Sequence, residues 1–199
     1  MSDVRNQLDA IRTYVHDLFQ NDATGHDFYH MERVAQLAKT ISMEEKADTF
    51  ICEAAAWLHD VGDKKLFTNP GQAMDHLDEF LIKINIERPT IEQIYDTTKD
   101  VSFSKGSIPT TIEGQIVQDA DRLDAIGAIG IARTFAYGGA TNQLIYQNGE
   151  PENTSVQHFY DKLLTIKDLM NTNYAKGLAK PRHAFLESYL KQFFREWES

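Results

Sequence analysis

The sequence contains a single cysteine, Cys52, among its 199 residues. One thiol cannot form a disulfide framework or a zinc site built on cysteine pairs, and it fits a reducing cytosol. Long apolar runs are also missing, and the first 19 residues are charged and amphipathic. We therefore expect neither a signal peptide nor a membrane span, and we predict a cytoplasmic protein.

Positive charge is scarce as well, because 20 lysines and arginines stand against 30 acidic residues and give a formal net charge of -10. A chain with this charge does not attract nucleic acid or an anionic membrane through its overall field. If its substrate is anionic, a bound cation or a small basic cluster must overcome the repulsion locally. We expect a small-molecule partner and a monomer or homodimer.

No internal repeat, low-complexity tract or linker rich in proline, glycine and serine divides the chain, so residues 1–199 are predicted to form one domain. Apolar residues recur with helical periodicity over most of the sequence. Strand signals are weak, and the best of them, residues 101–103, is short. The fold class is therefore predicted to be all-α, a bundle of about seven or eight helices. The clearest helical segments are 3–20, 31–41, 50–58, 112–123 and 183–197.

Two of the seven histidines stand in unusual surroundings. His59 and Asp60 end an apolar helical segment, where burying such a pair is costly unless the two are paired with other groups or coordinated. Taken alone, a helical His-Asp pair is more often a hydrogen-bonded surface couple. His30, however, begins another helix, and three further acids, Asp119, Asp121 and Asp124, lie within the apolar helical segment 117–125.

Two imidazoles and two carboxylates would form a mixed nitrogen and oxygen ligand set. Such a set suits one divalent ion with positions left open for water. We favour Mn²⁺, with Mg²⁺, Co²⁺, Ni²⁺ and Fe²⁺ as alternatives.

The segments HDFYHMERV, AAWLHDVGDKKL and QIVQDADRLDAIG resemble the HD-domain metal-dependent phosphohydrolases. The similarity extends over most of the chain and is closest to the small stand-alone bacterial members, which include nucleoside triphosphate pyrophosphohydrolases. It implies that His30, His59, Asp60 and Asp121 bind the metal. Asp121 is chosen because the family's ligand directly precedes an Arg-Leu step.

The same resemblance implies roles for residues around the ligands. Asp63 matches an acidic position that handles the nucleophilic water, and Lys65 matches a lysine common in the small members. With Arg33, Arg122 and Lys162, Lys65 is a candidate to bind substrate phosphates. Family members with two metals carry extra histidines between the doublet and the last aspartate, whereas here that interval holds only His76. We therefore expect one metal, and neither a cyclic-dinucleotide hydrolase nor a di-iron oxygenase.

The leading hypothesis is a hydrolase that acts on a nucleotide, with a (d)NTP cut to (d)NMP and pyrophosphate. A nucleoside monophosphatase or a phosphodiesterase would use the same four ligands, so both remain open. A third reading is a nucleotide-binding or regulatory module that keeps the fold without turnover.

Overall fold

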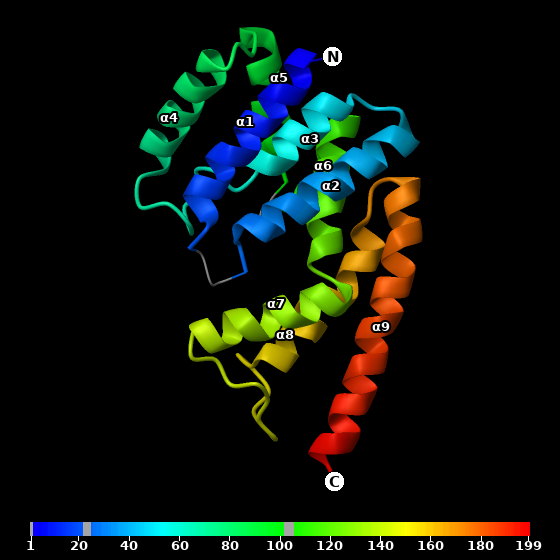
Figure 1. Cartoon of the computed structure of the whole chain (residues 1–199). Helices are drawn as coiled ribbons and strands as arrows, with labels where there is room; N and C mark the ends of the chain where they lie inside the picture. The colour runs from blue at the N-terminus through cyan, green and yellow to red at the C-terminus, as the bar shows by residue number, and fades with distance from the viewer. Residues whose placement is uncertain (1, 22–24, 102–105) are drawn as a thin grey trace.

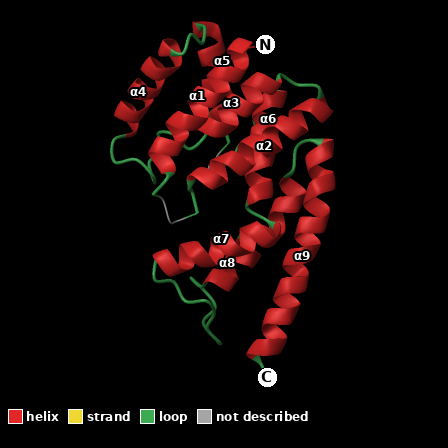
Figure 2. Ribbon diagram, in the orientation of Figure 1, coloured by secondary structure: helices red, strands yellow, loops and turns green. Residues whose placement is uncertain are grey.

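The computed structural model of the chain describes residues 2–21, 25–101 and 106–199 (Figure 1). All regular structure in these ranges is helical, comprising nine α-helices and one short 3-10 helix (Figure 2). The predicted all-α fold is therefore confirmed, with slightly more helices than expected. Residues 102–103 of the candidate strand at 101–103 lie outside the described residues. The elements are α1 (Ser2–Phe19), α2 (Phe28–Glu45), α3 (Thr49–Leu58), α4 (Pro70–Lys83), α5 (Arg88–Thr98), α6 (Ile112–Asp124), α7 (Gly127–Ala140), α8 (Ser155–Asp161), η2 (Leu163–Leu169) and α9 (Asn173–Trp197).

Helix α3 is the centre of the packing and contacts α1, α2, α5 and α6. Its middle is built from small side chains, Cys52 and Ala54–Ala56, all of which are fully buried. Small residues let neighbouring helices approach closely, so α2 and α6 can pack against the carboxyl-terminal part of α3. This packing brings together the segments that carry the predicted metal ligands.

Side-chain caps fix where these helices begin. Asp27 accepts a hydrogen bond from the His30 amide and starts α2, while Asp48 and Thr111 cap α3 and α6 in the same way. An oxygen at this position satisfies an amide that has no partner within the helix. The Asp27 cap fixes His30 in the first turn of α2.

A sharp turn after α6 sends the chain into α7, which lies with α8 below α2 in Figure 1. Gly127 begins α7 with a φ of 78°, a conformation that favours glycine. A Cβ on Gly130 would collide with the Ala125 carbonyl group. The two glycines thus allow the tight turn between α6 and α7.

Helix α9 begins ten residues earlier than predicted, at Asn173 rather than His183. Thr172 caps it by accepting from the Ala175 amide, and Pro181 lies inside the helix. Proline removes one helical hydrogen bond, which is why the sequence suggested a start beyond it. Among the residues described, no helix combines the length and apolar character needed to cross a membrane.

Candidate metal centre

The four predicted ligands converge from three helices. His30 lies in the first turn of α2, His59 and Asp60 follow α3, and Asp121 lies in the last turn of α6. The His30 Nε2 atom is 3.8 Å from Asp60 Oδ2 and 3.6 Å from Asp121 Oδ1. The His59 Nε2 atom is 3.5 Å from Asp60 Oδ1 and 3.9 Å from Asp121 Oδ1. Residues up to 91 positions apart in sequence thus bring two nitrogens and two carboxylates around one point.

Both imidazoles are oriented by their second nitrogen. The Nδ1–H of His30 donates to Asp124 Oδ2 and that of His59 to the Ala56 carbonyl, each at 2.8 Å. Such bonds fix the tautomer and leave Nε2 as a lone-pair donor. Both Nε2 atoms are buried, and neither has a hydrogen-bond partner among the described residues. Because a buried nitrogen without a partner is costly, this arrangement fits a divalent cation.

The charge states of His30 and Asp60 also suit a cation, whereas at His59 burial is outweighed by the charges of Asp60 and Asp121, which raise its pKa. Burial lowers the pKa of His30, although the hydrogen bond to Asp124 opposes the shift, so its imidazole is neutral as a metal ligand must be. Burial alone would raise the pKa of Asp60. His59 and the hydrogen bond from His26 nevertheless hold that pKa well below its ordinary value, so Asp60 is ionised.

His26 is a further residue of the site, and the sequence left its role open. Its Nδ1 lies 2.8 Å from Asp60 Oδ2, and its side chain is 39% exposed. His26, His30 and Asp60 form a second group of potential ligand atoms beside the group of His30, His59 and Asp121. The HDFYH spacing places His26 four residues before His30, but His26 precedes the Asp27 cap and so lies outside the helical pattern.

Asp124 is a second residue whose role the sequence did not reveal. It is 2% exposed and accepts hydrogen bonds from His30, from Arg33 Nε at 2.7 Å and from Arg133 Nη1 at 2.8 Å. Its spacing from Asp121, three residues on a helix, is a signal that both face the same side. The partners could not be deduced, because His30 is 94 residues away.

The predicted substrate-binding cations fall into two pairs. Arg33 is held by Asp124, and Arg122 is buried and donates to the Leu169 carbonyl. Lys65 is exposed and Lys162 half-buried; both are close enough for their charges to interact, and Lys162 also interacts with Asp121. Burial lowers the pKa of Lys162, with the charge of Asp121 opposing that shift.

Arg133 adds a cation that the sequence did not single out. It lies on α7, its side chain is 18% exposed, and its charge acts on His30, His59 and Lys162. It lies in the stretch after Asp121 that resembles the family, but its approach to the centre depends on the turn at Gly127 and could not be predicted from the sequence. Arg133 is therefore a further cation whose charge acts on the proposed ligands.

Asp63, the predicted partner of the nucleophilic water, lies in the turn after His59 and Asp60. Its amide donates to the Asp60 carbonyl at 3.2 Å, and its carboxylate accepts from the Lys65 amide at 2.8 Å. The side chain is partly exposed. The turn thus ties Asp63 to the doublet, and its role remains a prediction.

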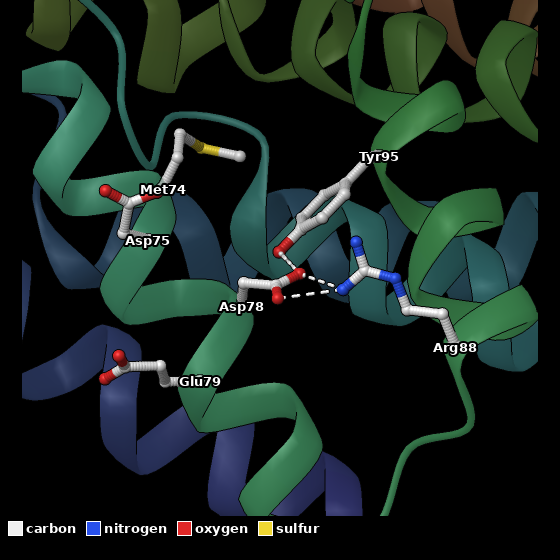
Figure 3. A pocket seen from close by; sticks show the side chains of 6 residues that line it. All are labelled: Met74, Asp75, Asp78, Glu79, Arg88 and Tyr95. Carbon is white, nitrogen blue, oxygen red and sulfur yellow. Dashed lines mark hydrogen bonds and ion pairs between the residues drawn. The ribbon is translucent and has the colours of Figure 1, made fainter.

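A separate cleft lies between α4 and α5 (Figure 3). There the two carboxylate oxygens of Asp78 accept hydrogen bonds from Arg88 Nη1, at 2.6 and 2.8 Å. One of these oxygens also accepts a hydrogen bond from the Tyr95 hydroxyl. Asp75 and Glu79 point from the same face of α4 without a drawn partner. None of the predicted site residues lines this cleft, so it is distinct from the candidate metal centre.

Comparison with known proteins places these features in a family. Residues 27–126 match the sequence model of the HD domain, which spans His30, His59, Asp60 and Asp121. The chain is 39% identical over 194 residues to the protein YpgQ of Bacillus subtilis, covering 96% of this chain and 93% of YpgQ.

Solved structures agree. The structure of B. subtilis YpgQ in complex with ADP superposes with a TM-score of 0.86 at 38% identity, over 98% of this chain and 96% of the other. An HD-superfamily hydrolase from Bacillus thuringiensis gives a TM-score of 0.82 at 41% identity, over 98% and 99% of the two chains.

Proposed function

Because the chain belongs to the HD-domain family of metal-dependent phosphohydrolases, we propose that it hydrolyses a nucleotide at a centre held by His30, His59, Asp60 and Asp121. The observation that carries the proposal is the pair of buried Nε2 atoms, both unpartnered among the described residues and both facing ionisable carboxylates. One divalent ion, with Mn²⁺ favoured, would satisfy both nitrogens.

When bound, such an ion lowers the pKa of a coordinated water and withdraws charge from phosphoryl oxygens. Asp63 is proposed to orient the attacking water or accept its proton, because it is tied to the ligand doublet by a tight turn. Lys65, Lys162 and Arg133 are proposed to bind the phosphate oxygens. They supply locally the positive charge that the chain as a whole lacks.

Two of the predicted cations, Arg33 and Arg122, are less suited to binding phosphate. Arg33 and Arg122 were candidates for phosphate binding, but each already donates to a protein oxygen. Arg122 is buried, so contact with substrate would require it to leave the Leu169 carbonyl. Arg133 also donates to Asp124, but its charge acts on His30, His59 and Lys162, so we rank it with Lys65 and Lys162 above these two.

The substrate is proposed to be a nucleoside triphosphate, converted to the monophosphate and pyrophosphate. The related YpgQ was crystallised with ADP, which supports a nucleotide ligand for proteins of this fold. Cleavage of a monophosphate or a phosphodiester is the second candidate, because the same ligands and cations could serve either reaction.

The test is to prepare metal-free protein, restore Mn²⁺, Mg²⁺, Co²⁺ or Ni²⁺ singly, and separate the products of (d)NTPs and (d)NMPs by chromatography. We expect metal-dependent pyrophosphate release that disappears in Asp60→Ala. Asp75→Ala is the matched control, because Asp75 is an exposed aspartate on α4 away from the centre.

The products decide between the candidates. Phosphate released from monophosphates, without action on triphosphates, would replace the pyrophosphohydrolase by a nucleotidase. Stoichiometric metal binding without turnover of any nucleotide would refute nucleotide hydrolysis and favour the regulatory module.

A further inference from the structure

A second cleft, of about 320 Å³, lies where α2, α7 and α9 meet. Its walls carry Arg33, Gln36 and Thr40 from α2, Ile129 from α7 and Arg182 from α9, and Asp124 also lines it. None of the four proposed metal ligands lines this space, nor do Asp63, Lys65 or Lys162. The cleft therefore adjoins the metal centre through Asp124 and Arg33 but contains none of its proposed ligands.

Arg182 is a half-buried cation with most of its donors unused. Its Nη1 donates to the Leu123 carbonyl, and this is the one hydrogen bond it makes within the described part of the chain. No carboxylate described by the structure lies within 4 Å of it. A guanidinium carries five N–H donors, so several remain for a ligand. Burial lowers the pKa of Arg182, and the charge of Asp124 opposes that shift.

Among the residues described, the one acid that lines the cleft, Asp124, acts on Arg182 only through its charge, because its hydrogen-bonding oxygens are taken by other groups. Asp124 already accepts from His30, from two nitrogens of Arg33 and from Arg133. Two other acids, Asp27 and Glu32, act on Arg33, but Asp27 caps α2 and Glu32 accepts from Arg12. Arg33, Arg133 and Arg182 thus stand against Asp124 and Asp27, while Glu32 is balanced by Arg12, so a net positive charge remains around the cleft in a chain whose net charge is -10.

We propose that this cleft is a second anion-binding site, which takes a phosphate group through Arg182, with the charge of Arg33 beside it. The planar guanidinium matches a phosphate with paired, charge-assisted hydrogen bonds. The exposed amide of Gln36 provides further donors on the α2 wall. Ile129, which is 43% exposed, offers an apolar surface for an organic group attached to the phosphate. The ligand class is thus inorganic phosphate or a small phosphate ester.

The test is residue-resolved NMR of the Mg²⁺-loaded, ¹⁵N-labelled protein, titrated with inorganic phosphate and separately with AMP. Saturable shifts are expected at the Gln36, Thr40 and Ile129 amides. The Arg182→Gln substitution should weaken binding at these amides about tenfold, the value of one lost charge-assisted contact. Lys162→Gln, which alters the proposed substrate site, should leave these shifts unchanged. Comparable affinities for the two probes would show that a phosphate group alone is enough for binding in the cleft. Tighter binding of AMP would show that the cleft prefers a phosphate ester.

A second variant guards against misfolding of Arg182→Gln, because Arg182 also holds the Leu123 carbonyl at the end of α6. Gln36→Glu adds a negative charge to the cleft from an exposed position and should weaken phosphate binding there. Gln93→Glu, the same change at an exposed position on α5, should not. Shifts confined to residues around His59 and Lys162, or equal binding by the two glutamate variants, would overturn the proposal. Its failure would leave the nucleotide-hydrolase assay unaffected, since that assay reports on Asp60 and not on Arg182.

Discussion

Replacing Asp124 by asparagine should weaken divalent metal binding although Asp124 is not itself a proposed ligand. Asp124 orients His30 by accepting its Nδ1–H at 2.8 Å, which leaves Nε2 facing Asp60 and Asp121. An amide at position 124 could present an N–H to that nitrogen and favour the wrong tautomer. Loss of such an orienting partner costs about 10- to 100-fold in metal affinity, or about 1.4–2.7 kcal/mol.

The same substitution should also destabilise the fold, because Asp124 is 2% exposed and receives both Arg33 and Arg133. Breaking a buried charge pair costs about 3–5 kcal/mol. We expect the lower end of that range, since the amide oxygen of asparagine still accepts one arginine. Titration calorimetry with Mn²⁺ measures the first effect, and urea unfolding of the metal-free protein measures the second.

The matched control is Asp78→Asn on α4. Asp78, like Asp124, accepts two hydrogen bonds from an arginine side chain. Its partner Arg88 is exposed, however, and the pair lies in the separate α4–α5 cleft. Surface pairs contribute little, so this variant should bind metal like the unaltered protein. If Asp124→Asn bound Mn²⁺ as tightly as Asp78→Asn while losing stability, Asp124 would be a structural residue, and the argument from the His30 tautomer would be refuted.

Three other substitutions or treatments have defined outcomes. His26→Gln should weaken Mn²⁺ binding about tenfold in calorimetry, because His26 is hydrogen-bonded to the proposed ligand Asp60 at 2.8 Å. An unchanged affinity would show that His26 does not help to position Asp60. The melting temperature should change little, because the His26 side chain is 39% exposed. Cys52 should resist a thiol reagent at pH 8 in the native protein and react fully in denaturant, since burial raises its pKa to about 12; rapid native labelling would contradict this. Asp119→Ala should lower the free energy of unfolding by about 3 kcal/mol or more, because Asp119 is buried and accepts the amide and hydroxyl of Thr172. A loss under 1 kcal/mol in urea unfolding would show that those donors find water instead.

Much of the fold was predictable because its helices follow a simple apolar periodicity. The start of α9 was not, since Pro181 suggested a boundary that tertiary packing overrides. Helix α9 continues across Pro181 because the turns before the proline pack against neighbouring elements, where Ala175 and Ala179 are fully buried. Sequence rules describe the cost of proline in an isolated helix and not the packing that offsets it.

Some residues of the candidate site could likewise be singled out from the sequence, and others could not. His30, His59 and Asp60 stand out locally, because each is a polar residue at the end or start of an apolar helix. Arg133 carries no such mark, and its approach to Asp124 depends on the direction of α7 after the turn at Gly127. Arg33 was predicted to bind substrate, and that role stays a prediction; its hydrogen bond to Asp124 could not be foreseen from the sequence.

The three aspartates of α6 show how far periodicity alone could have gone. At about 100° per residue, Asp121 and Asp124 lie about 60° apart around the helix, whereas Asp119 lies about 160° from Asp121. A helical wheel therefore separates Asp119, and the structure has it bound to Asn171 and Thr172. The wheel cannot tell Asp121 from Asp124, because the distinction depends on His30. Asp124 meets its Nδ1 and Asp121 lies near its Nε2, so one ring on another helix gives two neighbouring carboxylates different proposed roles.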